Sequence, residues 1–68
     1  MAFDYVIAVV IEHDQGEVKP VSLEVLNAAR NLADQASGKV IAFYLSQSVN
    51  SNADLFIQHG ADEVYFLI

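Results

Sequence analysis

Three consecutive ionisable residues, Glu12, His13 and Asp14, are the first place in this chain where chemistry could occur. An imidazole between two carboxylates can exchange protons, and the same groups can bind a divalent cation. They follow the apolar run Tyr5–Ile11, and open α/β folds bind ligands beyond the carboxyl ends of their strands. Residues adjacent in sequence seldom point at one ion, however. A solvated loop with a capping aspartate is therefore the favoured interpretation, and an acid–base or metal cluster is the alternative.

The other candidate residues offer weaker chemistry. His59 is expected at the end of a helix, at the opposite edge of the sheet from His13. The Ser46–Asn52 stretch could bind an anion at a helix N-terminus, but it lacks glycine and lysine, so capping is favoured. Tyr44 falls within a strand, as do Tyr65 and Phe66, where core or partner contacts are expected.

No sequence motif assigns a catalytic, cofactor-binding or metal-binding residue to this chain. Glycine-rich phosphate motifs of the G-x-G-x-x-G and G-x-x-x-x-G-K types are absent from the sequence, and no Ser/His/Asp or Cys/His arrangement can be drawn.

Composition narrows the class of protein further. The 68 residues make one domain at most, contain no cysteine, are 54% hydrophobic and carry a net charge of −6. A chain this short buries only roughly 60% of its unfolded surface, so part of its apolar surface is expected to meet something else. The acidic charge argues against nucleic-acid and membrane binding. No signal peptide is expected, because Asp4 interrupts the start, and we expect a cytoplasmic protein, with the mitochondrial matrix as the alternative.

The elements that position these residues begin with a buried strand. Tyr5–Ile11 is continuously apolar and rich in β-branched residues, which is typical of an inner strand of a parallel sheet. A polar loop over 12–20 precedes a helix predicted from 21 to 36, with Ser22 as N-cap and Gly38 as the left-handed C′ residue. One apolar stripe is predicted on this helix, formed by Val25, Leu26, Ala29, Leu32, Ala33 and Ala36.

The second half of the chain repeats the pattern. A strand over 40–45, a short helix over 53–59 closed by Gly60, and a strand over 63–68 complete a β-α-β-α-β order. Right-handed crossovers in one direction give the strand order 3-2-1 with both helices on one face. The opposite face is then bare and the first strand lies at an open edge, although its sequence is that of an interior strand. More chain or a partner must cover that face and edge.

The residues also resemble a known family. The opening V-I-A-V-V-I-E-H-D-Q-G-E-V-K-P is similar to the start of the electron transfer flavoprotein alpha subunit, which continues with an E-x-L-x-A-A-x-x-L helix, here Glu24 to Leu32. The later H-G-A-D-E-V-Y-F, His59 to Phe66, is similar to the family's Y-G-A-D-x-V-Y segment. The resemblance spans essentially all 68 residues. Unlike the family, this chain has Ser46 to Val49 in place of a glycine loop after the second strand, which weakens the case for a bound small molecule there.

The resemblance implies a three-layer, Rossmann-like domain of the adenine nucleotide alpha hydrolase type, with residues 1–68 forming its N-terminal part. It implies a scaffold and subunit-contact segment in a complex that carries electrons between flavin dehydrogenases and an acceptor oxidoreductase. FAD would be held by the rest of the alpha subunit and none is expected within these residues. The expected partners are the beta subunit and the remaining alpha chain, with self-association through the 4–11 edge as a further option. A small stand-alone binding or signalling module, receiver-like or stress-protein-like, is the alternative function.

Overall fold

The computed structural model describes residues 5–15, 17–45 and 53–67. Its elements, in order, are β1 (Tyr5–Ile11), β2 (His13–Asp14), β3 (Glu17–Val18), α1 (Pro20–Gln35), β4 (Gly38–Leu45), α2 (Ala53–Gln58) and β5 (Glu63–Leu67). The predicted β-α-β-α-β order is confirmed, and a small hairpin is added to it.

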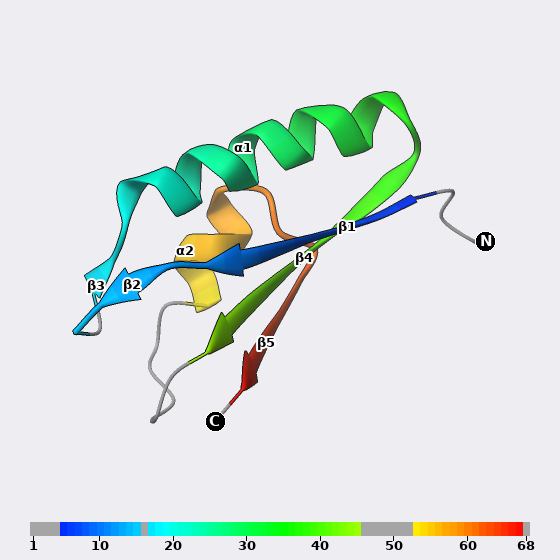
Figure 1. The fold of residues 1–68 in the computed structure, drawn as a ribbon. Helices are drawn as coiled ribbons and strands as arrows, with labels where there is room; N and C mark the ends of the chain where they lie inside the picture. Colours follow the sequence, from blue (N-terminus) through cyan, green and yellow to red (C-terminus); the bar gives the residue numbers. More distant parts are fainter. Residues whose placement is uncertain (1–4, 16, 46–52, 68) are drawn as a thin grey trace.

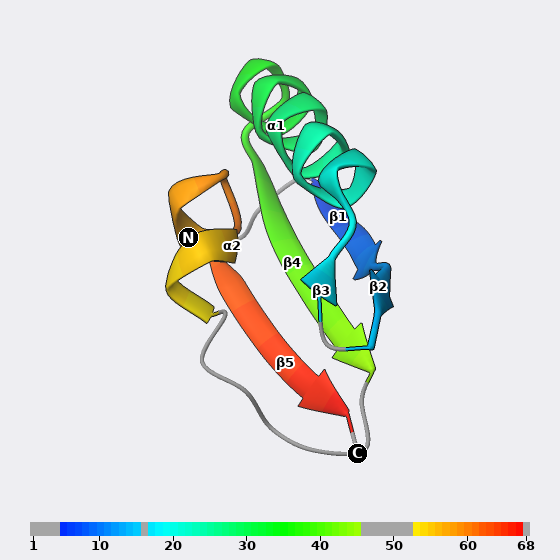
Figure 2. The same ribbon diagram turned by 90° about the vertical axis from the view of Figure 1, so that its left-hand side faces the viewer.

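A parallel three-stranded sheet of order β1-β4-β5 organises the fold (Figure 1). Val9 lies beside Ala42, and Ala42 lies beside Val64, so the strands are in a continuous register. Both helices lie on the same side of this sheet (Figure 2). The predicted parallel α/β fold and the strand order 3-2-1 are therefore confirmed, with β4 at the centre.

The core lies between the helices and one face of the sheet. Alternate strand residues point into it because successive side chains on a strand point to opposite faces. The fully or nearly fully buried apolar residues are Val9, Ile11, Leu26, Ala29, Ala33, Val40, Ala42, Tyr44, Phe56 and Ala61. The rings of Phe56 and Phe66 both lie 5.7 Å from that of Tyr44, so the end of the central strand is packed with aromatic rings.

Helix α1 begins differently from the prediction. Pro20 occupies the first turn, where its missing N–H costs nothing, and Lys19 is the N-cap without a side-chain capping bond. Ser22 is not the N-cap. Its side chain is buried within the first turn, and its hydroxyl oxygen accepts the Glu12 N–H at 2.7 Å. Ser22 has the residue type of an N-cap, but its side chain links the helix by a hydrogen bond to Glu12, the residue that follows β1.

The end of α1 also corrects the prediction. Ser37, with φ of 54°, is the left-handed residue, and Gly38 is already the first residue of β4. A Cβ on Gly38 would lie 3.2 Å from the Ala33 side chain, tighter than an ordinary contact. Gly38 therefore allows β4 to lie close to α1, and it does not cap the helix.

The predicted apolar stripe on α1 is wider than the face that the sheet covers. Leu26, Ala29 and Ala33 are buried, as predicted, whereas Val25 and Leu32 are 46% and 58% exposed. The apolar positions of α1 thus form two sets, one against the sheet and one along the flank of the helix.

The polar loop after β1 contains a hairpin that the sequence did not indicate. His13–Asp14 pairs antiparallel with Glu17–Val18, and Gln15 at its tip has φ of 51°. Gly16, which follows Gln15, lies outside the described residues. The prediction for Gly60 is confirmed: it follows α2 with φ of 122°.

Candidate functional site

The consecutive residues Glu12, His13 and Asp14 do not form one site. The Glu12 backbone closes the hairpin, because its carbonyl accepts the Lys19 N–H at 2.9 Å, while its side chain lies 4.0 Å from the Lys19 ammonium. Asp14 is exposed at the hairpin tip. Successive residues of a strand point to opposite sides, so His13, which packs against Leu45 and Tyr44, is turned away from its acidic neighbours.

His13 packs against the carboxyl end of the sheet. Its Nε2–H donates to the Leu45 carbonyl at 2.6 Å, and its ring stacks on that of Tyr44 with centroids 4.6 Å apart. Its Nδ1 is buried and has no hydrogen-bond partner. The imidazole therefore holds the hairpin to the central strand, which is a structural contact.

Across residues 5–15, 17–45 and 53–67 no group of three or more histidine, cysteine or acidic side chains gathers as metal ligands would. His59 follows α2, near the amino end of β5, whereas His13 follows the carboxyl end of β1, so the two histidines lie at opposite edges of the parallel sheet, as predicted. The 46–52 stretch, proposed as a weak anion site, lies outside the described residues.

Sequence reasoning missed a polar cluster at the amino end of β5. The Asp62 carboxylate accepts the Val40 N–H at 2.8 Å and an Arg30 N–H at 2.9 Å, and Arg30 also donates to the Gly60 carbonyl at 3.1 Å. Partial burial opposes ionisation of Asp62, but the bonds from Val40 and Arg30 outweigh it and hold the pKa of this carboxyl below its usual value. We call Arg30, Gly60 and Asp62 the Arg30 clasp; it joins α1, β4 and the start of β5.

The Gly-Ala-Asp segment was the signal that could have revealed the clasp. A Cβ on Gly60 would lie 2.6 Å from the Arg30 Cβ, Ala61 is buried in the core, and Asp62 bonds Val40. Each of the three residues is thus constrained by packing or hydrogen bonding.

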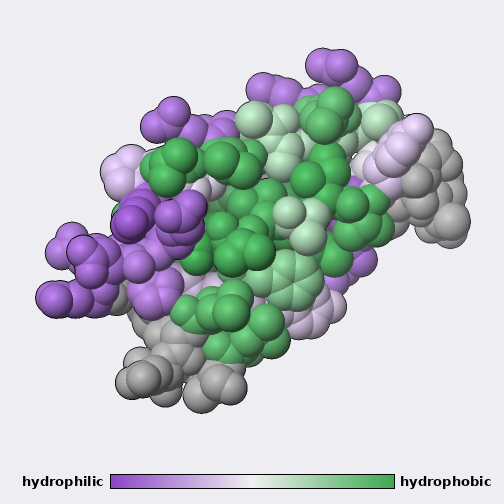
Figure 3. Space-filling view, viewed as in Figure 1, coloured by the Kyte–Doolittle hydropathy of each residue, from purple (hydrophilic) through white to green (hydrophobic). Residues whose placement is uncertain are grey.

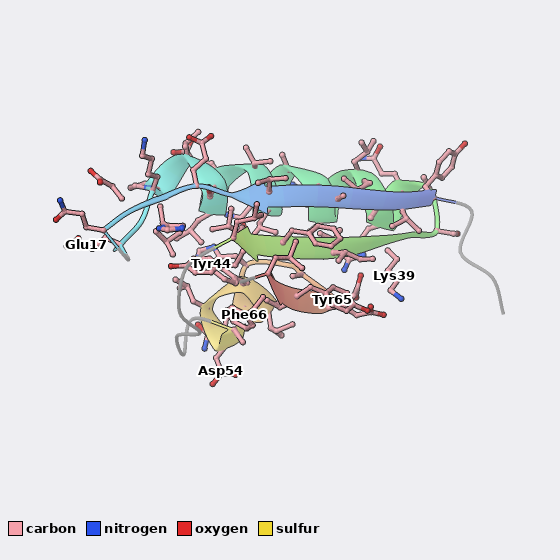
Figure 4. The ribbon with its side chains drawn as sticks, turned by 60° about the horizontal axis from the view of Figure 1, so that its bottom comes forward. Glu17, Lys39, Tyr44, Asp54, Tyr65 and Phe66 are labelled. Atoms are coloured by element: carbon pink, nitrogen blue, oxygen red, sulfur yellow. The ribbon has the colours of Figure 1, made fainter. Side chains whose placement is uncertain are left out.

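A second polar group lies on the opposite face of the sheet. Glu63 pairs with Lys39 and accepts the Tyr65 hydroxyl at 2.8 Å. The hydrogen bond to Lys39 lowers the pKa of Glu63, and the bond to Glu63 raises the pKa of Tyr65. Figure 4 shows Lys39 and Tyr65 near one another. Lys39 and Glu63 are half-buried and Tyr65 is exposed, so the three groups pair with one another at the surface of the sheet.

The face of the sheet turned away from the helices is apolar and uncovered by any described residue. We call it the bare face. Exposed apolar residues on it include Val10, Leu45, Tyr65 and Leu67, the last 48% exposed. It consists of Val6, Ala8 and Val10 of β1, Lys39, Ile41, Phe43 and Leu45 of β4, and Glu63, Tyr65 and Leu67 of β5.

The apolar surface extends from the bare face past the open edge of β1 and onto α1. Val21, Val25, Ala28 and Leu32 recur at three- and four-residue steps along one flank of the helix, and all four are exposed. We call them the α1 flank. Figure 3 shows hydrophobic side chains running together across β1 and the adjacent part of α1. The most notable surface of the chain is therefore apolar and incompletely covered.

No helix among the described residues is long and apolar enough to cross a membrane.

The sequence comparisons define the class of protein. Residues 7–68 match the family model of the electron transfer flavoprotein domain, and the chain belongs to this family. The expected resemblance is thereby confirmed. No solved structure gave a significant match.

The chain is similar to three curated subunits. It is 39% identical over 59 residues to the electron transfer flavoprotein subunit alpha of Megasphaera elsdenii, covering 87% of this chain and 18% of that protein. It is 43% identical over 53 residues to protein FixB of Clostridium saccharobutylicum, covering 78% and 16%. It is 30% identical over 59 residues to the lactate dehydrogenase (NAD(+),ferredoxin) subunit LctC of Acetobacterium woodii, covering 87% and 14%. The chain thus spans less than a fifth of the length of these relatives.

Proposed function

We propose that these 68 residues are the N-terminal scaffold and subunit-contact part of an electron transfer flavoprotein alpha-type domain. The observation that carries the proposal is the bare face. A sheet with helices on only one side leaves about half of its apolar surface in water, and parallel sheets are found almost only where both faces are covered. The family membership supports a flavoprotein complex as the source of that cover.

The proposed parent complex is an electron carrier. Electrons would pass between flavin dehydrogenases and an acceptor oxidoreductase through FAD held outside these residues. LctC is named as a subunit of a dehydrogenase, so a parent that forms part of an enzyme complex agrees with the same assignment. The proposed partners are a beta subunit and the remainder of an alpha-type chain, and the proposed location is the cytoplasm.

The structure gives no observation that favours the stand-alone signalling module. That alternative depended on a cation at the end of the first strand. There the Glu12 carboxylate lies 4.0 Å from the Lys19 ammonium, and the described residues include no group of three or more side chains placed as metal ligands.

Two measurements test the proposal. The 68-residue chain should show no stoichiometric quenching of FAD fluorescence, and it should bind a purified electron transfer flavoprotein beta subunit in calorimetry. Leu67→Lys places a charge on the bare face and should weaken that binding at least tenfold, because a buried unpaired charge is costly. Asn31→Lys adds the same charge on the exposed outer side of α1 and should leave binding unchanged. Tight FAD binding by the chain alone, or equal binding by both variants, would overturn the proposal.

A further inference from the structure

We propose that one helix of the remaining alpha-type chain packs along β1 and β4 on the bare face, and that Lys39, Glu63 and Tyr65 form the polar border of its contact area. The inference rests on the proposed function and deepens it, because it assigns one half of the bare face to one kind of element.

Polar groups are confined to one side of the bare face. The strand register places its residues in rows across the sheet, so that Ala8 of β1 lies beside Ile41 of β4, and Ile41 lies beside Glu63 of β5. Every β1 residue on this face is apolar, and on β4 only Lys39, near the start of the strand, is charged. The first two of the three β5 residues on this face, Glu63 and Tyr65, carry polar atoms. The apolar half of the bare face therefore lies over β1 and β4.

The three polar side chains bond one another, and we call them the Lys39 triad. One carboxylate oxygen of Glu63 pairs with Lys39, and the other accepts the Tyr65 hydroxyl at 2.8 Å. The side chains of Lys39 and Glu63 keep 24% and 36% of their surface in water. Covering them fully would remove this remaining hydration, and the attraction within an ion pair often does not repay that cost. A cover that ends at the triad is favoured, since interfaces keep charged groups at their rim.

The apolar half of the face has the width of one helix. Neighbouring strands lie about 4.8 Å apart and a helix with its side chains is about 10 Å across, so one helix spans two strands. Helix α1 spans the same two strands on the other face, where it packs on β1 and β4. A helix in the matching place on the bare face would cover Val10, which is 62% exposed, together with Ala8 and Phe43. It would leave Glu63 and Tyr65 beside its flank.

The chain outside these residues is the source of such a helix. The aligned residues make up only 14–18% of the curated relatives, so most of an alpha-type subunit lies beyond them. Parallel sheets are covered on both faces, and the covering elements are the helices that connect their strands. A connecting helix is therefore the expected occupant of the β1–β4 half, and the β5 side near Leu67 is left for the beta subunit.

Lys39 lies where the carboxyl end of this helix would come. A connecting helix returns the chain to the amino end of the sheet, so it runs opposite to the strands. Its carboxyl end carries unpaired carbonyl groups and a partial negative charge, which a nearby cation stabilises. Lys39 lies near the amino end of β4 and is the one cation among the bare-face residues described above. Its position favours the same orientation of the helix.

Hydroxyl-radical footprinting read by mass spectrometry tests the contact area without any substitution. The oxidation rates of Val10 and Tyr65 are compared between the 68-residue chain and the complete alpha-type subunit, both without the beta subunit. The rate at Val10 should fall at least tenfold in the complete subunit, because the helix excludes water there. The rate at Tyr65 should stay within threefold, because it lies at the border.

The footprint separates this inference from the proposed function. Protection of both residues, or of Tyr65 alone, would mean that the cover extends over the Lys39 triad, and it would overturn the inference while leaving the scaffold assignment intact. Protection of neither residue would overturn both, since the remaining chain would then not cover the bare face at all.

A matched pair of substitutions gives a second measurement. Val10 and Tyr65 are both exposed in the 68-residue chain, so Val10→Gln and Tyr65→Gln should each change its Tm by less than about three degrees. In the complete subunit, Val10→Gln buries an amide without a partner and should lower the Tm by more than five degrees, whereas Tyr65→Gln should have the same small effect as before. An equal effect of Val10→Gln in the two proteins would overturn the inference.

Discussion

Replacing Asp62 with alanine should destabilise the fold through the Arg30 clasp. The substitution removes the acceptor for the Val40 N–H, at 2.8 Å, and for Arg30, at 2.9 Å, without touching the apolar core. The Asp62 N–H donates to the Val40 carbonyl at 2.8 Å in both the wild type and the variant, so only the side-chain half of this reciprocal pair is lost.

The expected loss of stability depends on how exposed the bonds from Val40 and Arg30 to Asp62 are. The Val40 N–H is partly buried, and leaving such a donor unpaired costs about 1–2 kcal/mol. The Arg30–Asp62 ion pair is 28% and 40% exposed at its two side chains, and screening by water limits it to roughly 0.5 kcal/mol. The sum, about 2 kcal/mol, is a large share of the total stability of about 3–10 kcal/mol expected for 68 residues. Asp62→Asn keeps an oxygen for Val40 and should cost less than about 1 kcal/mol.

Urea unfolding followed by circular dichroism measures both costs. Because the folded pKa of Asp62 lies below its unfolded value of about 3.9, its charge stabilises the fold above that pH, and this contribution is lost as the pH falls through the folded pKa. The stability difference between wild type and Asp62→Asn should therefore be present at pH 7 and shrink below about pH 4.

Asp34→Ala is the matched control. Asp34 bonds the same arginine at 3.0 Å, but it is 66% exposed and four residues away on the same helix, so its loss should cost no more than about 0.5 kcal/mol. Equal losses for Asp34→Ala and Asp62→Ala would show that the Val40 bond contributes nothing, and this would refute the reasoning.

Three further substitutions test the backbone geometry. Gly60→Ala should cost roughly 2–3 kcal/mol and lower the Tm by ten degrees or more, since its Cβ would clash with Arg30 at a φ of 122°; an unchanged Tm would contradict this. Ser37→Gly should raise the Tm by a few degrees, because glycine removes about 1 kcal/mol of left-handed strain at φ 54°; a lower Tm would disprove it. Ser22→Ala strands the Glu12 N–H and should cost about 1–2 kcal/mol in urea unfolding, and a neutral result would mean that water replaces the hydroxyl.

The strands and their order could be predicted because their signals are local or general. Continuous apolar runs located β1, β4 and β5 to within two residues, and the handedness of crossover connections gave the order. The uncovered face followed from the same rule.

The details of α1 could not be predicted because periodicity alone does not say which flank meets the sheet. Val25 and Leu32 satisfy the apolar spacing as well as Leu26 does, yet they face the open edge. Ser22 has the type of a cap, but Pro20 determines where the helix begins.

The contacts of His13 and Asp62 could not be predicted for a different reason. His13 and Leu45 are 32 residues apart, and Asp62 and Val40 are 22 apart, so neither hydrogen bond has a local sequence signature. Only the packed fold shows that His13 holds the hairpin and that the Gly-Ala-Asp segment forms a clasp.

The central position of β4 has a consequence for synthesis on the ribosome. Neither β1 nor β5 pairs with the other, so β1 has no strand partner until residue 45 has emerged. At about 5–20 residues per second, the strand waits roughly 2–7 s with both of its edges unpaired. During that interval neighbouring nascent chains on one messenger would present the same strand to each other, so polysomes are where β1 of one chain has its best opportunity to pair with β1 of another.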